Sequence, residues 1–288
     1  MRLNESQEVS GGQHNVTRVE KPAGHVREAE RPGLYAAISI VSPGKDAKGE
    51  EKNQDKLKLL KFTDGENSTW HLAAVCDGVT PSPCAAVAAE YVSDRVRELF
   101  HEGGLRRITE RLQAMRRSLL VQPKYQRAYQ TTFVAVCMKR GATSPAGVIS
   151  VKAVGCGDCA LFIFREAGGL YYNNVNLKDE QDRFRSALAS IPMLPDYYDE
   201  ESDNVLFEFE EYPEDAHLLL CSDGLYDGFA NFKELYGWLN EHRAELMNPA
   251  LRDGCLSELH HNLKRLKEDD DITFIWLRPH GSCAASEE

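Results

Sequence analysis

Aspartates that end or interrupt short apolar runs recur along the whole chain. Asp77 directly follows such a run at 72–76, and Asp223 follows another at 218–222. A carboxylate at the tip of a buried strand is costly unless a charge neutralises it. Hard cations with oxygen ligands are the usual partners, so the pattern predicts a site for Mg²⁺, Mn²⁺ or Ca²⁺. The full set is Gln54-Asp55, Asp77-Gly78, Gly157-Asp158, Ser222-Asp223-Gly224, Asp227 and Asp270-Asp271.

Such a site is suited to phosphoester hydrolysis. Two divalent cations that share one bridging aspartate can hold a phosphate oxygen, lower the pKa of a water molecule and stabilise an in-line attack. The chain has no Gly-x-Ser-x-Gly elbow and no P-loop, so acyl transfer by that elbow and P-loop nucleotide hydrolysis lose support. The residues therefore favour a metal-dependent hydrolase.

The bulk composition is that of an ordinary globular protein. Among 288 residues, 42% are hydrophobic and 27% are charged, with a net charge of −11. This acidity disfavours a nucleic-acid partner, because phosphate contacts need clustered lysine and arginine. No apolar run approaches the ~20 residues that span a bilayer, and residues 1–6 lack the apolar core of a secretion signal. We therefore expect a cytoplasmic protein with reduced cysteines and no membrane partner.

The apolar patterns predict an α+β fold. Strand-like runs come in hairpin-like groups with helical patterns between them, which favours antiparallel sheets covered by helices over a doubly wound parallel sheet. Helices are predicted over 82–100, with Ser82 as the N-cap, over 105–121, and twice within 232–267. Strands are predicted at 34–41, 57–62, 70–76, 130–138, 148–154, 160–165, 169–172, 205–209, 217–221 and 272–277.

The expected domain organisation is one catalytic domain over 33–278. Residues 1–32 are polar and without a period, which predicts a flexible N-terminal arm. Residues 173–204 are long, charged and irregular, as in an active-site flap or an interaction insert. Residues 279–288 form a polar tail.

The ordered set of motifs resembles the metal-dependent serine/threonine protein phosphatases of the type 2C class, in a divergent, bacterial-like branch. Each motif alone is weak, but six in the same order are specific. The resemblance covers about 33–278 and rests on Asn53-Gln54-Asp55, Ala74-Val75-Cys76-Asp77-Gly78, Gln130-Thr131-Thr132-Phe133, Gly157-Asp158-Cys159, Cys221-Ser222-Asp223-Gly224 and Asp269-Asp270-Asp271-Ile272-Thr273.

This resemblance implies a fold, an activity and a role for each matching residue. The implied fold is a central sandwich of two antiparallel β-sheets flanked by α-helices, a four-layer αββα arrangement. The implied activity is hydrolysis of phosphoserine and phosphothreonine in proteins, with two Mg²⁺ or Mn²⁺ ions and a weaker third. Asp77 would bridge the ions, the Gly78 carbonyl would bind the second, and Asp223 and Asp270 would bind the first. Asp158 and Asp227, with Asp223, would form the third site, and Asp55 would act from the outer shell.

The departures from the family pattern concern the substrate phosphate more than the metals. The family usually has an arginine shortly before the N-terminal acidic pair, and this chain has lysines, of which Lys48 and Lys52 are the candidates for holding phosphate. A lysine offers a point charge and not the two-pronged fork of arginine. Lys45, which precedes both, is a third candidate. Asp271 stands where the family has its terminal asparagine.

Alternatives remain open at this level. Each aspartate alone could be a turn-capping residue after a strand. The protein could be a pseudophosphatase that only binds phosphoproteins, or an enzyme for a small phosphorylated metabolite. The sequence does not indicate the phosphoprotein substrate or the oligomeric state.

Overall fold

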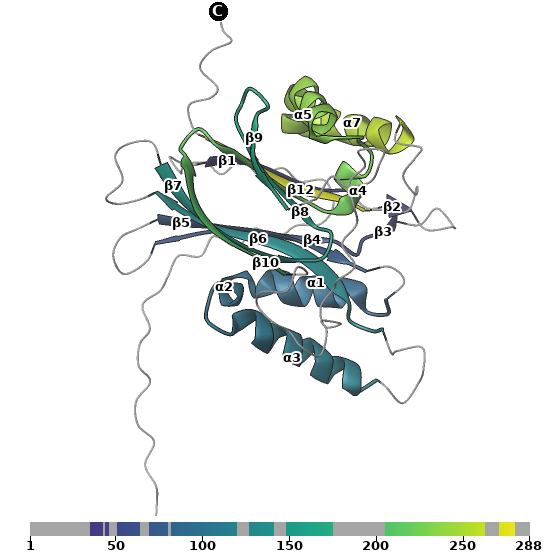
Figure 1. Cartoon of the computed structure of the whole chain (residues 1–288). Coiled ribbons are helices and arrows are strands. Elements are labelled where there is room, and N and C mark those ends of the chain that lie inside the picture. Colours follow the sequence, from purple (N-terminus) through teal and green to yellow (C-terminus); the bar gives the residue numbers. More distant parts are fainter. Residues whose placement is uncertain are drawn as a thin grey trace, which may run out of the picture.

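A computed structural model describes residues 35–42, 44–45, 51–63, 69–79, 82–119, 127–140, 148–174, 205–262 and 271–279. Two five-stranded sheets lie face to face, with helices on the outer side of each (Figure 1). Every pairing between their strands is antiparallel. The predicted four-layer αββα sandwich is therefore confirmed.

The first sheet has the strand order β1-β12-β11-β8-β9, and the second has the order β10-β7-β6-β5-β4. The strands of the first sheet are β1 (Tyr35–Ser42), β8 (Ala160–Phe164), β9 (Leu170–Asn173), β11 (His217–Cys221) and β12 (Ile272–Pro279). Those of the second are β4 (Lys56–Thr63), β5 (Thr69–Gly78), β6 (Thr131–Arg140), β7 (Val148–Cys156) and β10 (Val205–Pro213). A separate short hairpin pairs β2 (Gly44–Lys45) with β3 (Glu51–Lys52).

The central strands are apolar throughout because both of their faces are covered. In β8, Leu161 and Ile163 point into the core between the sheets, whereas Phe162 and Phe164 pack under the C-terminal helices. In β6, Val134 faces the other sheet and its neighbours belong to the core beneath the N-terminal helices. Burial on both sides removes the apolar–polar alternation of a half-exposed strand.

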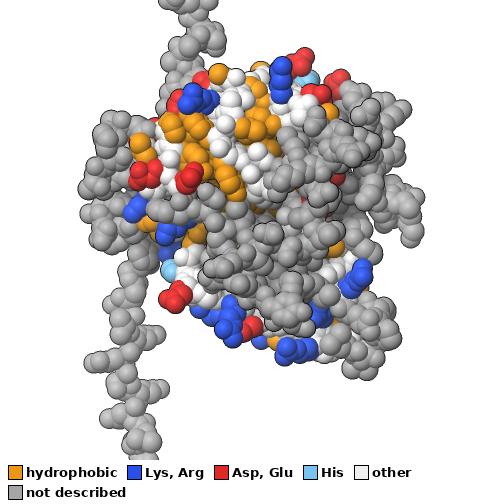
Figure 2. Space-filling model, viewed as in Figure 1, with side chains coloured by type: hydrophobic (Ala, Val, Ile, Leu, Met, Phe, Trp, Pro, Cys, Tyr) orange, Lys and Arg blue, Asp and Glu red, His pale blue; other side chains and the backbone are white. Residues whose placement is uncertain are grey.

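Two helical layers close the sandwich. The helices α1 (Ala85–Asp94), α2 (Val96–Leu99) and α3 (Gly104–Arg117) lie over the second sheet. The helices α4 (Asp223–Tyr226), α5 (Phe232–Glu241), α6 (Arg243–Met247) and α7 (Pro249–Asn262) belong to the first sheet's side. The outer surface of the α1–α3 layer is rich in arginine, visible in blue at the bottom of Figure 2.

The predicted helix over 82–100 is wrong in its start and in its continuity. It begins at Ala85, after Cys84 in the left-handed conformation, and a break at Arg95 separates α1 from α2. Ser82 does not cap the helix. Its hydroxyl donates to the Arg127 carbonyl (2.6 Å) and accepts from the Gln130 amide (3.0 Å), so it ties the start of the helix to the segment before β6.

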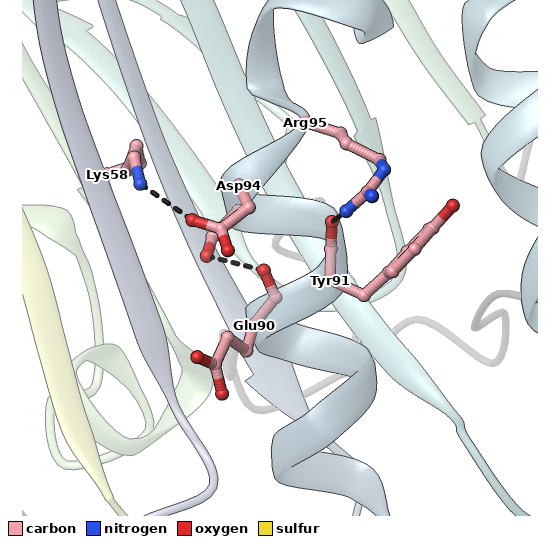
Figure 3. A network of polar contacts seen from close by, with 6 residues as sticks. Lys58, Glu90, Tyr91, Asp94 and Arg95 are labelled. Atoms are coloured by element: carbon pink, nitrogen blue, oxygen red, sulfur yellow. Dashed lines mark hydrogen bonds and ion pairs between the residues drawn. The ribbon is translucent and has the colours of Figure 1, made fainter.

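Polar contacts fix α1 against the edge of the second sheet (Figure 3). Lys58 on β4 pairs with Asp94 at the end of α1 at 2.7 Å. The Arg95 guanidinium lies 3.7 Å from the centre of the Tyr91 ring and donates to the Tyr91 carbonyl (3.3 Å). The Lys58–Asp94 pair thereby joins the helix to β4, the strand that pairs with the one carrying Asp77.

Several predictions concern residues that lie outside the described part of the chain. These are the arm at 1–32, all but the first two residues of the insert at 173–204, and the tail after Pro279. They stay predictions. Within the described residues, no helix has the length and apolarity needed to cross a membrane.

We predict that the core packing under the C-terminal helices dominates stability. The Phe162 ring is fully buried and stacks on Phe232 at 5.1 Å. Phe162→Ala should lower the free energy of unfolding by about 3–5 kcal/mol, because it removes a buried ring and leaves a cavity. Denaturant unfolding followed by circular dichroism measures this loss.

The matched control is Lys58→Ala. Asp94 is 45% exposed in its side chain, so this ion pair is screened by solvent. Its removal should cost about 1 kcal/mol or less. Equal losses in the two variants would contradict this assignment of the core.

Candidate active site

The sheets bring most of the predicted aspartates to one end of the sandwich. Asp77 lies near the end of β5, and Asp55 directly precedes the paired strand β4, where Lys56 faces Cys76. In the first sheet, Asp158 lies in the turn before β8 and Asp223 begins α4 directly after β11. Paired β8 and β11 meet at Ala160 and Cys221, so these two acids lie at the same sheet edge.

The side chains are close enough to perturb one another. Burial, then Asp271, raises the pKa of Asp55 to about 8, although polar neighbours offset part of the rise. Burial, then Asp55, holds the pKa of Asp77 well above its usual value, and Asp158 adds to this effect. Burial also raises the pKa of Asp158. None of the largest influences on these three carboxyl groups comes from a lysine or arginine.

Buried oxygen atoms in this cluster lack hydrogen-bond partners. They include both carboxylate oxygens of Asp55, one carboxylate oxygen of Asp158 and the side-chain oxygen of Asn53. Asp55 is only 1% exposed, so water does not replace the missing partners easily. Buried, unneutralised carboxylate and amide oxygens are the donor set that Mg²⁺ and Mn²⁺ prefer, and the residues therefore fit the expected cations.

Two glycines are required by the shape of the site. A Cβ atom on Gly78 would come within 2.8 Å of the Gln54 carbonyl oxygen and 2.9 Å of the Ala85 backbone. Gly78 thus allows the Asp77 loop, the Asp55 loop and the start of α1 to touch. Gly157 has φ = 95°, a conformation that favours glycine and that turns the chain at Asp158.

Several residues position the acidic loops, and sequence reasoning had given them no role. Thr131 on β6 donates its hydroxyl to the Asp77 carbonyl at 2.6 Å. The Tyr226 hydroxyl on α4 donates to the Asp158 carbonyl at 2.7 Å, so it joins the Asp223 segment to the Asp158 turn. Asn174 holds the same turn by accepting from the Leu161 amide (2.6 Å) and donating to the Cys159 carbonyl (3.0 Å).

Asp271 connects two parts of the site that are far apart in the sequence. Its carboxylate accepts from the backbone amide of Gln54 at 2.5 Å and more weakly from that of Asp55 at 3.3 Å. It therefore fastens the loop before β4 to the start of β12, and its charge acts on Asp55. The motif at 269–273 indicated this position, but the bonds to a loop 216 residues away depend on the register of the sheet.

The remaining predicted site residues are less well supported by the geometry. Asp227 lies at the end of α4 and is exposed, and it acts electrostatically on Cys221 and Tyr226. Asp270 and Lys48 lie outside the described residues. Lys52 pairs with Gly44 in the β2–β3 hairpin, and the position of its side chain is not described.

The spacing Cys159-x₅-Arg165, which occurs in cysteine-dependent phosphatases, does not form a phosphate site here. The five intervening residues are strand β8, which keeps the two ends apart. Cys159 is buried and Arg165 is exposed. Burial raises the pKa of the Cys159 thiol well above its usual value, so it is not a thiolate at neutral pH.

Comparison with solved structures identifies the fold. The serine/threonine phosphatase Stp1 from Staphylococcus aureus matches with a TM-score of 0.51 and 14% identity, over 92% of this chain and 99% of that one. PppA, a regulatory component of the type VI secretion system in Pseudomonas aeruginosa, matches with 0.52 and 17%, over 85% and 97%. A phosphatase from a pathogenic strain of Toxoplasma gondii matches with 0.54 and 13%, over 85% and 93%.

No family model matches the sequence, and no curated protein matches it. The similarity therefore lies in the structure, at identities of 13–17% in these three comparisons. The fold expected from the resemblance is confirmed: the chain has the α+β sandwich found in serine/threonine phosphatases.

We predict that the metal-free protein loses stability as pH rises from about 4 to about 8. The pKa of Asp55 is about 8 in the folded state against a usual value of 3.8, so the folded protein binds more protons than the unfolded chain across this interval. The melting temperature in chelator should fall by several degrees over it, and Mn²⁺ should restore stability most at pH 8. Thermal unfolding with chelator or Mn²⁺ measures both effects.

Asp55→Asn provides the matched variant. It removes one buried charge, so the pH dependence in chelator should become shallower. A wild-type melting temperature that rises between pH 5 and pH 8 in chelator would contradict the assignment of a repulsive cluster.

Proposed function

We propose that the chain is a metal-dependent phosphatase that hydrolyses phosphoserine and phosphothreonine in proteins. The observation that carries this proposal is the group of buried and half-buried carboxylates at one end of the sandwich, with unpartnered oxygens on Asp55 and Asp158. Its fold, which it shares with serine/threonine phosphatases, supports the same function.

Each residue of the cluster then has a specific task. Asp77 would bridge two ions, the Gly78 carbonyl would bind one of them, and Asp223 and Asp270 would bind the other. Asp55, buried beside Asp77, would orient ion-bound water. Bound Mg²⁺ or Mn²⁺ would supply the positive charge for the phosphate oxygens and lower the pKa of the attacking water.

The protein's own residues keep this arrangement rigid before any ion binds. Thr131 fixes the Asp77 backbone, and Tyr226 couples the Asp158 turn to α4. Asp158 and Asp227, with Asp223, would hold a weaker third ion. Because Asp227 is exposed and Asp158 is half-buried, this third site would be the most open to solvent and to exchange.

The substrate would be a phosphorylated protein in the cytoplasm, in a signalling role. Lys48 or Lys52 would hold its phosphate group, since both precede the Asp55 loop in the sequence. No observation in the described residues favours the binding-only alternative, which predicts metal binding without turnover.

Asp223→Ala is the direct test of the activity. It should reduce Mn²⁺-dependent hydrolysis of para-nitrophenyl phosphate and of a phosphothreonine peptide by at least about 100-fold, the order expected when a group that stabilises transition-state charge is lost. Asp215→Ala, which changes an exposed aspartate in the turn before β11, should retain full activity. A wild type that binds Mn²⁺ but releases no phosphate would support the pseudophosphatase.

The phosphate-binding lysines are tested by paired substitutions. If Lys48 or Lys52 holds the phosphate, its change to alanine should raise KM by roughly tenfold, about 1.4 kcal/mol of binding, and its change to arginine should restore most of the loss. Lys56→Ala, just after Asp55, is the control and should leave KM unchanged. Unchanged KM in both alanine variants would rule these lysines out as the phosphate anchor.

A further inference from the structure

A second group of metal-ligand side chains lies among the C-terminal helices, on residues that the proposed phosphatase reaction does not use. His242 follows α5, Glu245 lies on α6 and Cys255 lies on α7. One ligand atom from each of the three lies within 4.8 Å of the others. Among the described residues, no other group of three histidine, cysteine or acidic side chains brings its ligand atoms this close together.

The contacts within the group join three helices at one point. His242 Nδ1 and Glu245 Oε2 are 2.6 Å apart, within hydrogen-bond distance. Burial, then Glu245, raises the pKa of the Cys255 thiol to about 12. The ring of His242 is held in place by Trp238, with 5.2 Å between the ring centres.

The donor types select a metal. One imidazole nitrogen, one thiol and one carboxylate form a mixed nitrogen, sulfur and oxygen set, which suits Zn²⁺ and not the Mg²⁺ expected at the aspartate cluster. Ligand atoms around one tetrahedral Zn²⁺ are roughly 3–4 Å apart, given metal–ligand bonds of about 2.0–2.3 Å. The observed separations come within this range after small side-chain movements.

We propose that His242, Glu245 and Cys255 form a Zn²⁺ site that clamps α5, α6 and α7 together. The ion replaces the proton between Nδ1 and Oε2 and the proton of the thiol. The fourth ligand is either a water molecule or Glu258. Glu258 lies near the thiol, one turn further along α7. The role of this site is structural, because the ion joins the helices of the layer that covers Phe162 and Trp276.

An ordinary helical ion pair accounts for only part of this arrangement. His242 and Glu245 are three residues apart, a spacing at which such pairs are common. That explanation assigns no role to the nearly buried Cys255, 6% exposed, beside the same carboxylate. A metal site uses all three residues.

The test is metal binding to the full chain, stripped with chelator and kept in saturating Mg²⁺ so that the aspartate cluster is occupied. Wild type should bind one Zn²⁺ per chain, measured by elemental mass spectrometry after desalting. Co²⁺ should produce the near-ultraviolet absorption of a cobalt–thiolate bond. Zn²⁺ should raise the melting temperature of the wild type and not that of Glu245→Gln.

The variants separate this site from the aspartate cluster. Cys255→Ser should abolish the cobalt–thiolate absorption, and Glu245→Gln and His242→Gln should weaken Zn²⁺ by at least about tenfold. Cys137→Ser, Glu241→Gln and Asp77→Asn should bind as wild type does. Glu245 is 45% exposed in its side chain, so Glu245→Gln remains decisive even if Cys255→Ser fails to fold.

Three outcomes overturn the proposal. One is Co²⁺ binding without the thiolate absorption. Another is Zn²⁺ affinity that is unchanged in both Glu245→Gln and His242→Gln. The third is loss of the Zn²⁺ in Asp77→Asn alone, which would assign that ion to the aspartate cluster.

Discussion

The structure depends on a group of like charges buried at the ends of strands. Asp55, Asp77 and Asp158 each have a raised pKa, with burial as the largest cause and with neighbouring carboxylates adding to the rise for Asp55 and Asp77. Like charges in a poorly solvated place oppose folding. The sandwich tolerates them because its apolar core is large, and a bound cation would turn the repulsion into attraction.

The rest of the fold serves to hold these carboxylates in place. Strands β8 and β11 are buried on both faces, so a shift of either strand would disrupt close packing against both the other sheet and the C-terminal helices. Hydrogen bonds then fasten the loops beyond the strand ends: the hydroxyls of Thr131 and Tyr226 donate to backbone carbonyls, and the Asp271 carboxylate accepts from a backbone amide. The Gly78 contact adds a steric limit, since any side chain there would push the Asp55 loop away. A rigid site of this kind would be preorganised for the proposed ions before they bind.

Most of the fold could be predicted from the sequence because the strands and helices have clear apolar patterns. The hairpin-like grouping of strands indicated antiparallel sheets, and the order of the acidic motifs indicated that they meet. The break between α1 and α2 could not be predicted, because the apolar residues on the two sides of Arg95 continue one helical period. The left-handed Cys84 was likewise hidden, since that conformation is unusual for cysteine.

The residue types of the site could be predicted from the sequence, but the hydrogen bonds that hold its loops in place could not. The aspartates at strand ends were visible as motifs, whereas the role of Tyr226 depends on which turn its hydroxyl reaches across the sheet edge. Asp271 shows the same limit, because a carboxylate that caps a distant backbone cannot be told from a metal ligand by sequence position. His242, Glu245 and Cys255 gave no motif at all, since their spacing of three and ten residues acquires meaning only when α6 and α7 fold back on α5.

The central claim is that the aspartate cluster binds a pair of divalent cations bridged by Asp77. Electron paramagnetic resonance of the Mn²⁺-loaded protein tests it directly, because two Mn²⁺ ions that share a carboxylate have coupled spins. The account predicts a coupled spectrum at two Mn²⁺ per chain that Asp77→Asn converts to the spectrum of isolated ions. An isolated-ion spectrum in the wild type at every Mn²⁺ loading would contradict it.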